Sequence, residues 1–108
     1  SLVGGRLLTN TVAGILVAGD ALATVMTTTL EGNNTGFQFA GTVTPTLWHN
    51  SVAGNLSWGV LNSADFTIDA SWNWWGDASG PTHPANPGGA GDKVSDRVIY
   101  TPWLAAAP

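Results

Sequence analysis

A repeat of 22 residues is the feature that most constrains how this chain can fold. Apolar residues recur at this spacing, or within one residue of it, throughout residues 1–76. Three such series are Val3, Val25, Leu47 and Ile68; Leu8, Leu30, Val52 and Trp74; and Ile15, Phe37 and Val60. Because several independent positions share one period, the sequence predicts a stack of similar structural units in which each series forms an inward-facing ladder.

Glycine and amide residues follow the same period and indicate where each unit turns. The glycine series are Gly32, Gly54 and Gly76, and Gly14, Gly36 and Gly59; the first is followed by Asn33, Asn55 and Asp77. Glycine and asparagine are the residues that most easily adopt the left-handed backbone of a tight corner. We therefore predict corners at both glycine series and a polar ladder along Asn33, Asn55 and Asp77.

The segments between these corners have the composition of short β-strands. Examples are residues 15–17, 24–27, 37–39 and 66–68, which are rich in β-branched and aromatic residues. Strong helix formers are scarce, since the chain contains one Glu, one Lys and one Gln. A 22-residue period suits leucine-rich repeats and β-solenoids, but the leucine-rich consensus is not met. We therefore predict an all-β fold, a short parallel β-helix (a solenoid) of about three to four rungs.

The composition changes after residue 76, which divides the single domain into two parts. Five of the six prolines lie in residues 77–108 and the repeat stops there. We predict rungs in residues 1–76, an irregular capping segment in 77–108 and a last strand from Val94 to Tyr100. A solenoid end exposes apolar side chains and backbone and must be covered. The predicted covering residues are Trp72, Trp74, Trp75, Tyr100 and Trp103. Of the adjacent pair, Trp74 is expected to continue the inward ladder and Trp75 to face outward or join the cap.

The C-terminal third also carries four motifs that resemble a known family. They are Asn-Trp-Trp-Gly at 73–76, Ser-Gly-Pro at 79–81, Gly-Asp-x-Val at 91–94 and Tyr-x-Pro-Trp-Leu at 100–104. This run resembles the C-terminal end of right-handed parallel β-helix proteins of the pectate-lyase-like type. The resemblance implies a right-handed β-helix with a tryptophan-rich cap, and it identifies an architecture rather than a reaction.

Composition excludes several classes of function. A net charge of −4 with three basic residues does not suit the phosphates of nucleic acid. The absence of cysteine excludes disulfides and thiolate metal sites. No apolar run reaches the roughly 18 residues that a membrane span needs. Because the chain begins at Ser1 without a signal peptide, we expect a processed or excised part of a longer protein.

The ionisable residues do not form a recognisable active site. β-helix relatives include pectate lyases, with calcium-binding acidic clusters and a basic residue, and hydrolases with paired Asp. Here Asp65 and Asp69 have no acidic equivalents one rung away, and Arg6 is the only basic residue of the predicted rungs. His49 and His83 lack metal-ligand spacing. We therefore predict no catalytic residues, no bound metal and no cofactor, so that the chain is not an enzyme.

Three large side chains are candidates for a binding face or an oligomer contact. Trp48 follows the inward Leu47 and should project outward, Met26 holds the equivalent place one rung earlier, and Trp58 precedes a corner glycine. The competing interpretation is that the C-terminal segment folds over these residues. Apolar residues in 1–12 add a second expected contact surface.

From these features we predict a non-catalytic structural or interaction module of a larger secreted or cell-surface protein, bacterial or archaeal. Its expected partners are further copies of itself or upstream β-helix rungs of a parent chain. The alternative is the carbohydrate-binding C-terminal part of a polysaccharide lyase or hydrolase, with polysaccharide as the partner.

Overall fold

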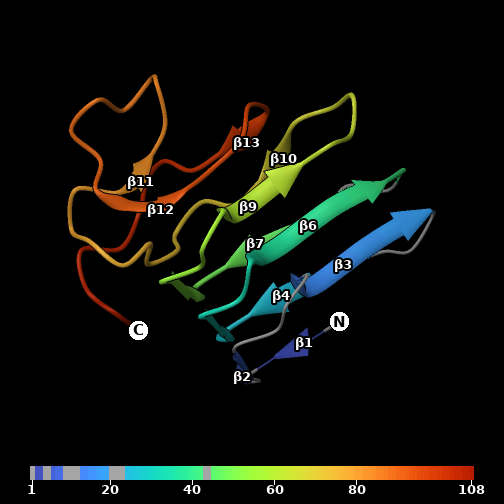
Figure 1. The fold of residues 1–108 in the computed structure, drawn as a ribbon, viewed down its shortest axis with the longest axis horizontal. Helices are drawn as coiled ribbons and strands as arrows, with labels where there is room; N and C mark the ends of the chain where they lie inside the picture. Colours follow the sequence, from blue (N-terminus) through green and yellow to red (C-terminus); the bar gives the residue numbers. More distant parts are fainter. Residues whose placement is uncertain (1, 4–5, 9–12, 20–23, 43–44) are drawn as a thin grey trace.

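The computed structural model describes residues 2–3, 6–8, 13–19, 24–42 and 45–108. In this part of the chain, thirteen short strands and no helix are present, so no described segment is a helix that could cross a bilayer (Figure 1). The prediction of an all-β fold built from short parallel strands is therefore confirmed.

Three parallel sheets contain most of these strands. The first sheet has the order β1 (Leu2–Val3), β4 (Thr24–Met26), β7 (Thr46–Trp48), β10 (Ile68–Asp69) and β13 (Val98–Ile99). The second has the order β2 (Arg6–Leu8), β5 (Thr29–Glu31) and β8 (Ser51–Ala53). The third has the order β3 (Ala13–Gly19), β6 (Thr35–Gly41) and β9 (Trp58–Asn62).

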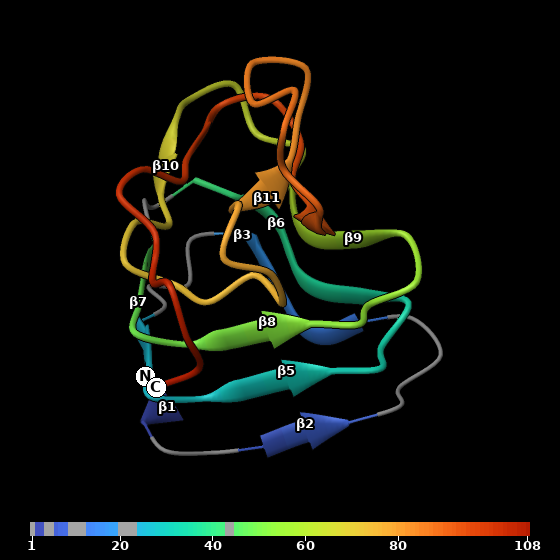
Figure 2. The same cartoon turned by 90° about the vertical axis from the view of Figure 1, so that its left-hand side faces the viewer.

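The chain visits the three sheets in turn and adds one strand to each on each of the first three passes. We call one such pass a rung. Figure 2 shows β2, β5 and β8 lying above one another, with β11 and the loop that follows it toward the opposite end of the molecule from β2. All pairings between successive rungs are parallel. The period in the sequence therefore corresponds to one rung.

The register confirms one predicted ladder and corrects the other two. Ile15 pairs with Phe37, and Phe37 pairs with Val60, as the sequence predicts. In the first sheet, however, Leu2 and not Val3 pairs with Val25. The corresponding shift in the second sheet pairs Leu7, rather than Leu8, with Leu30. Both differences arise because the first rung is 23 residues long in these two sheets, so an exact 22-residue count selects the wrong neighbour.

Later rungs shift by one residue for a local reason. Glu31 pairs with Ala53, whereas Thr35 pairs with Trp58, so the connection between β8 and β9 is one residue longer than that between β5 and β6. As a result, Asp69 pairs with Thr46. The next residue, Ala70, therefore lies beside Leu47, where the sequence predicted Ile68. The same shift pairs Ser51 with Trp74, so Trp75 takes the place next to Val52.

The core lies between the three sheets. Its fully enclosed side chains come from successive rungs and include Val25, Leu30, Phe37, Phe39, Leu47, Val52, Val60, Ile68 and Trp75. The parallel rings of Phe37 and Phe39 are 6.4 Å apart, and Phe66 meets Phe39 edge-on at 5.7 Å. Stacked, well-packed rings of this kind stabilise a narrow core beyond the area that they bury.

The corners use left-handed backbone, as predicted for one glycine series. Gly32, Gly54 and Gly76 have φ values of 67°, 65° and 96°. The other glycine series, Gly14, Gly36 and Gly59, lies inside β3, β6 and β9, so its prediction as a corner is wrong. A Cβ added to Gly36 would lie 2.7 Å from the Gly59 carbonyl oxygen and 2.9 Å from Asn55 Nδ2. These glycines therefore make room for inward-pointing amide side chains.

A second type of corner follows the first sheet and is formed by residues other than glycine. Thr27, His49 and Trp72 have φ values of 48°, 58° and 61°. Each is followed by a polar residue that is buried: Thr28, Asn50 and Asn73. The Asn50 amide donates to the Val25 carbonyl (2.9 Å), and its side-chain oxygen accepts from the Thr28 N–H (3.0 Å). The buried asparagines thus satisfy backbone groups that the strained corners leave without a partner.

The C-terminal segment covers the end of the stack opposite β1, β2 and β3. After Trp75 the chain makes an irregular excursion and returns through β11 (Pro81–Thr82) and β12 (Gly91–Lys93), which pair with each other. Val94 then pairs with Val60, and β13 pairs with β10. The predicted strand from Val94 to Tyr100 is thus shorter, because Arg97 turns the chain with a φ of 60°.

Candidate functional site

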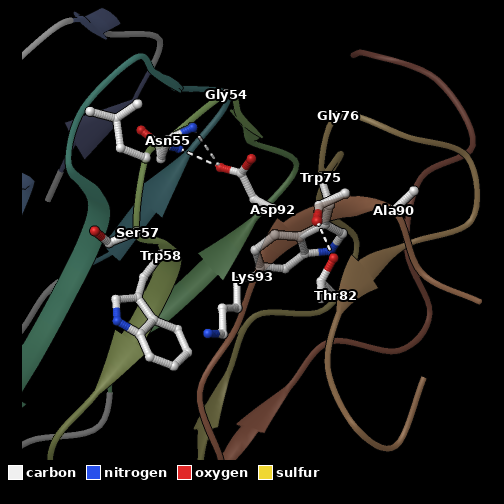
Figure 3. A pocket seen from close by; sticks show the side chains of 12 residues that line it. Gly54, Asn55, Ser57, Trp58, Trp75, Gly76, Thr82, Ala90, Asp92 and Lys93 are labelled. Atoms are coloured by element: carbon white, nitrogen blue, oxygen red, sulfur yellow. Dashed lines mark hydrogen bonds between the residues drawn. The ribbon is translucent and has the colours of Figure 1, made fainter. Parts of the chain in front are cut away.

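A cleft of about 640 Å³ lies between the β8–β9 connection and the C-terminal segment (Figure 3). One wall is the connection that carries the additional residue, from Gly54 to Ser57. The other wall is formed by Trp75, Thr82 and the strand β12. The connection that carries the additional residue therefore helps to form this cleft.

Trp58 and Lys93 form one side of this cleft. The Lys93 ammonium nitrogen lies 4.6 Å from the centroid of the Trp58 ring, close enough for a cation–π interaction. Figure 3 shows the Lys93 side chain extending toward this indole. Lys93 is exposed and Trp58 is partly exposed, so both can be reached from solvent.

Asp92 lies within the cleft and takes the place predicted for Asp77. Its Oδ2 accepts hydrogen bonds from Asn55 Nδ2 (2.6 Å) and from the Asn55 N–H (3.2 Å). Asn55 in turn accepts from the Asn33 N–H (3.0 Å). The polar ladder is therefore Asn33, Asn55 and Asp92. The prediction of Asp77 is wrong because the excursion begins there, and Asp77 instead caps its own turn through Ser79.

Burial raises the pKa of Asp92 to about 6, even though hydrogen bonds from Asn55 and Gly54 act in the opposite direction. The negative charge of Glu31 adds to the increase. The carboxyl group therefore changes its charge in a mildly acidic range in which an ordinary aspartate is fully ionised.

This pKa predicts how the stability of the protein depends on pH. Because the folded protein binds the Asp92 proton more tightly than the unfolded chain does, the contribution of Asp92 to the free energy of unfolding should be largest at about pH 4 and below. It should then decrease as the pH rises through about 6. For this half-buried group we expect a loss of about 1–2 kcal/mol, since solvent screens part of the effect. Asp92→Asn should remove this part of the dependence, and urea unfolding of both proteins at pH 4.5 and 7.5 measures it. An equal pH dependence in the two proteins would contradict the assignment.

A second hollow of about 290 Å³ adjoins the cleft and shares Trp58 and Lys93 with it. His83 and Asp96 lie in this second hollow, with His83 Nε2 and Asp96 Oδ1 2.9 Å apart. The other ring nitrogen, Nδ1, accepts a hydrogen bond from the Ala85 N–H (3.0 Å). Nε2 therefore carries the proton that bonds Asp96, and the pair is fixed in one orientation.

The predicted surface residues Met26 and Trp48 lie elsewhere, on the outer face of the first sheet. They pair across β4 and β7, and Trp48 is 37% exposed. Although partial burial acts in the opposite direction, hydrogen bonds from Ser71 and the Trp48 indole lower the pKa of Asp69. The Trp48 ring is therefore held against Asp69 on this face. The C-terminal segment does not fully cover Trp48, and it forms a wall of the cleft beside Trp58.

The predicted capping residues have different environments. Trp75 is fully enclosed, whereas Trp74 is partly buried and Trp72 is 45% exposed. The expectation that Trp74 is the inward member of the pair is therefore wrong. Tyr100 and Trp103 stack with centroids 6.3 Å apart and pack against the core, and Trp103 Nε1 donates to the Ala78 carbonyl (2.9 Å).

The sequence analysis did not identify Asp92, Lys93 or the His83–Asp96 pair as parts of a site. Asp92 and Lys93 belong to the Gly-Asp-x-Val motif, but that motif was interpreted as a feature of the fold and not of a binding site. Among the described residues, no three His, Asp or Glu side chains lie together in a way that could hold a metal ion. The chain matches no protein-family model, and the searches of curated proteins and of solved structures gave no significant match.

Proposed function

We propose that the chain is a short right-handed parallel β-helix of the pectate-lyase-like type that acts as a non-catalytic structural module. In this proposal the module belongs to a larger secreted or cell-surface protein, and it joins other rungs of the same kind end to end. The repeated passage through three parallel sheets supports the β-helix. The right-handed sense follows from the strong preference of parallel crossover connections for that hand.

The observation that carries the proposal is the difference between the two ends of the stack. The three parallel sheets end together on β1, β2 and β3, and no described strand pairs with the outer edges of these strands. At the other end, residues 77–108 cover the last rung. Edge strands that lie side by side present unpaired N–H and C=O groups, and these groups pair readily with a further strand.

The covered end also predicts what kind of assembly forms. Among the described strands, β1, β2 and β3 leave all three sheets open at one end, whereas at the other end β13 is an edge strand of the first sheet alone. In this proposal two copies therefore join through β1, β2 and β3, and the capping segment opposes extension into a filament. A contact that uses the same surface on both copies closes after two. In a longer parent chain, upstream rungs would occupy the same position instead.

Light scattering coupled to size exclusion tests the proposal on this chain. We expect a dimer, and we expect Leu2→Lys to yield monomers because a charged residue on an edge strand opposes further pairing. Trp48→Lys, on the outer face of the first sheet, is the matched control and should leave the dimer intact. A wild-type monomer that persists at high concentration would contradict end-to-end joining. Dissociation by Trp48→Lys alone would instead assign the contact to the side of the stack.

Carbohydrate binding is the second candidate function. The observation that favours it is the partly exposed Trp58 beside a cleft that also holds Asp92 and Lys93. An aromatic ring with a few fixed polar groups is the composition expected of a small-ligand site.

A further inference from the structure

Two adjoining hollows lie beside Trp58, and we refer to them together as the groove. The larger hollow lies between the β8–β9 connection and β12, and the smaller one contains His83 and Asp96. Both are lined by Trp58 and Lys93, so these two residues stand where the hollows meet. Volumes of about 640 and 290 Å³ together suit an elongated ligand rather than a single small molecule.

The groove contains both apolar and polar groups. Trp58 offers a partly exposed indole at the junction, and Leu56 is 82% exposed at one wall. Asp92 and Asp96 can accept hydrogen bonds, one in each hollow, and Lys93 can donate them. A sugar ring has an apolar C–H face and a rim of hydroxyl groups that both donate and accept, so it matches this combination of groups.

The carboxylates of the groove are hydrogen-bonded by neighbours within the protein. Asn55 donates to Asp92, and His83 is hydrogen-bonded to Asp96. Lys93 stands against the Trp58 ring, where it would repel a second cation. An anionic polymer would in turn meet the carboxylates of Asp92, Asp96 and the nearby Glu31. Neither a strongly acidic nor a strongly basic ligand is therefore favoured.

We infer that this groove binds a short stretch of a neutral polysaccharide, with one sugar ring stacked on Trp58 and hydroxyl groups bonded to Asp92, Lys93 and Asp96. The inference goes beyond the proposed stacking of rungs, and it rests on the second candidate function, to which it assigns a site and a class of ligand. End-to-end joining uses β1, β2 and β3, whereas the groove is lined by the β8–β9 connection and by β12.

Isothermal titration calorimetry with defined oligosaccharides tests the inference. The probes are neutral gluco-, xylo- and manno-oligosaccharides of six units, with oligogalacturonate as the anionic comparison and deacetylated chito-oligosaccharide as the cationic one. We expect at least one neutral probe to bind more tightly than about 10 mM and more tightly than either charged probe. Trp58→Ala should weaken that binding roughly tenfold or more, as expected for the loss of one stacked ring.

Two further variants make the result specific. Trp48→Ala removes an exposed indole outside the groove and should leave the affinity unchanged. Lys93→Met keeps much of the length of an exposed side chain but removes its donors, so it tests the groove even if Trp58→Ala fails to fold. No binding of any neutral probe, a preference for a charged probe, or affinity that survives both Trp58→Ala and Lys93→Met would overturn the inference. The oligomeric state is measured separately, so failure of the groove and failure of end-to-end joining are distinguishable.

Discussion

Trp75→Ala is expected to lower the free energy of unfolding by about 3–5 kcal/mol, the cost of removing a large aromatic side chain from a packed core. Trp75 is fully enclosed and is the largest side chain of the core. It lies next to Val52 of the preceding rung, and it also lines the cleft beside the C-terminal segment. Trp75 therefore packs between the last rung and that segment. A domain of this size commonly has a total stability of only about 5–15 kcal/mol, so the variant should be largely unfolded at moderate urea concentrations.

Two matched variants separate packing from the polar tip of this residue. Among the described residues, none accepts a hydrogen bond from Trp75 Nε1. Neither substitution of Trp75 therefore loses a hydrogen bond, and Trp75→Phe should cost less than Trp75→Ala because it removes less buried volume. Trp74→Ala removes a partly buried neighbour and should also cost less. Urea unfolding followed by circular dichroism provides the comparison, and equal losses for Trp74→Ala and Trp75→Ala would show that the register of the last rung is wrong.

Asn73→Ala is expected to lower the free energy of unfolding by about 3–5 kcal/mol, because it leaves several buried polar groups without partners. Asn73 is fully buried, and its Nδ2 donates to the carbonyls of Ala70 (2.6 Å) and Leu47 (2.8 Å). Its Oδ1 accepts from the Asn50 N–H (2.9 Å) and from Asn50 Nδ2 (3.0 Å). One side chain thus satisfies groups from two rungs, and the loss should be cooperative.

Asn34→Ala is the matched control for this prediction. Asn34 is also an asparagine of a corner, but it is only partly buried, and its side-chain oxygen accepts from the Ser57 hydroxyl at the surface. We expect this variant to lose about 1 kcal/mol or less, since water can replace an exposed partner. Thermal unfolding of both variants measures the difference. A loss for Asn73→Ala as small as that for Asn34→Ala would contradict a structural role for the buried ladder.

The all-β class of the fold was predictable because each rung buries apolar side chains at equivalent positions. These positions repeat in the sequence, so the period is visible without a structure. The ladder from Ile15 through Phe37 to Val60 was predicted correctly, since these residues lie in the longest strands, where the alternation is clear. The other two ladders were wrong at their first and last members, by two residues at Ile68 and by one at the other three positions, because an added residue in a connection is not visible to a fixed period. Thus Trp75 and not Trp74 became the inward residue.

The site was less predictable for a different reason. Asp92 joins Asn33 and Asn55 only after the excursion of residues 77–90, and no repeat spacing relates it to them. His83 and Asp96 meet because the same excursion folds back on the last rung. The buried asparagines Asn50 and Asn73 stand 23 residues apart, but they follow corners formed by His49 and Trp72, residue types that rarely adopt left-handed backbone. The conformational preferences of these residue types therefore did not indicate the corners.

Hydrogen exchange measured at low and at high protein concentration tests the central claim, that the strand edges at one end of the stack pair with another copy. The account predicts that amides of β1, β2 and β3 become more protected as the concentration rises, while those of the capping segment 77–108 do not change. Trp48→Lys should leave this pattern intact, and Leu2→Lys should abolish it. Exchange in β1, β2 and β3 that is independent of concentration, or new protection confined to the capping segment or to the outer face of the first sheet, would contradict the claim.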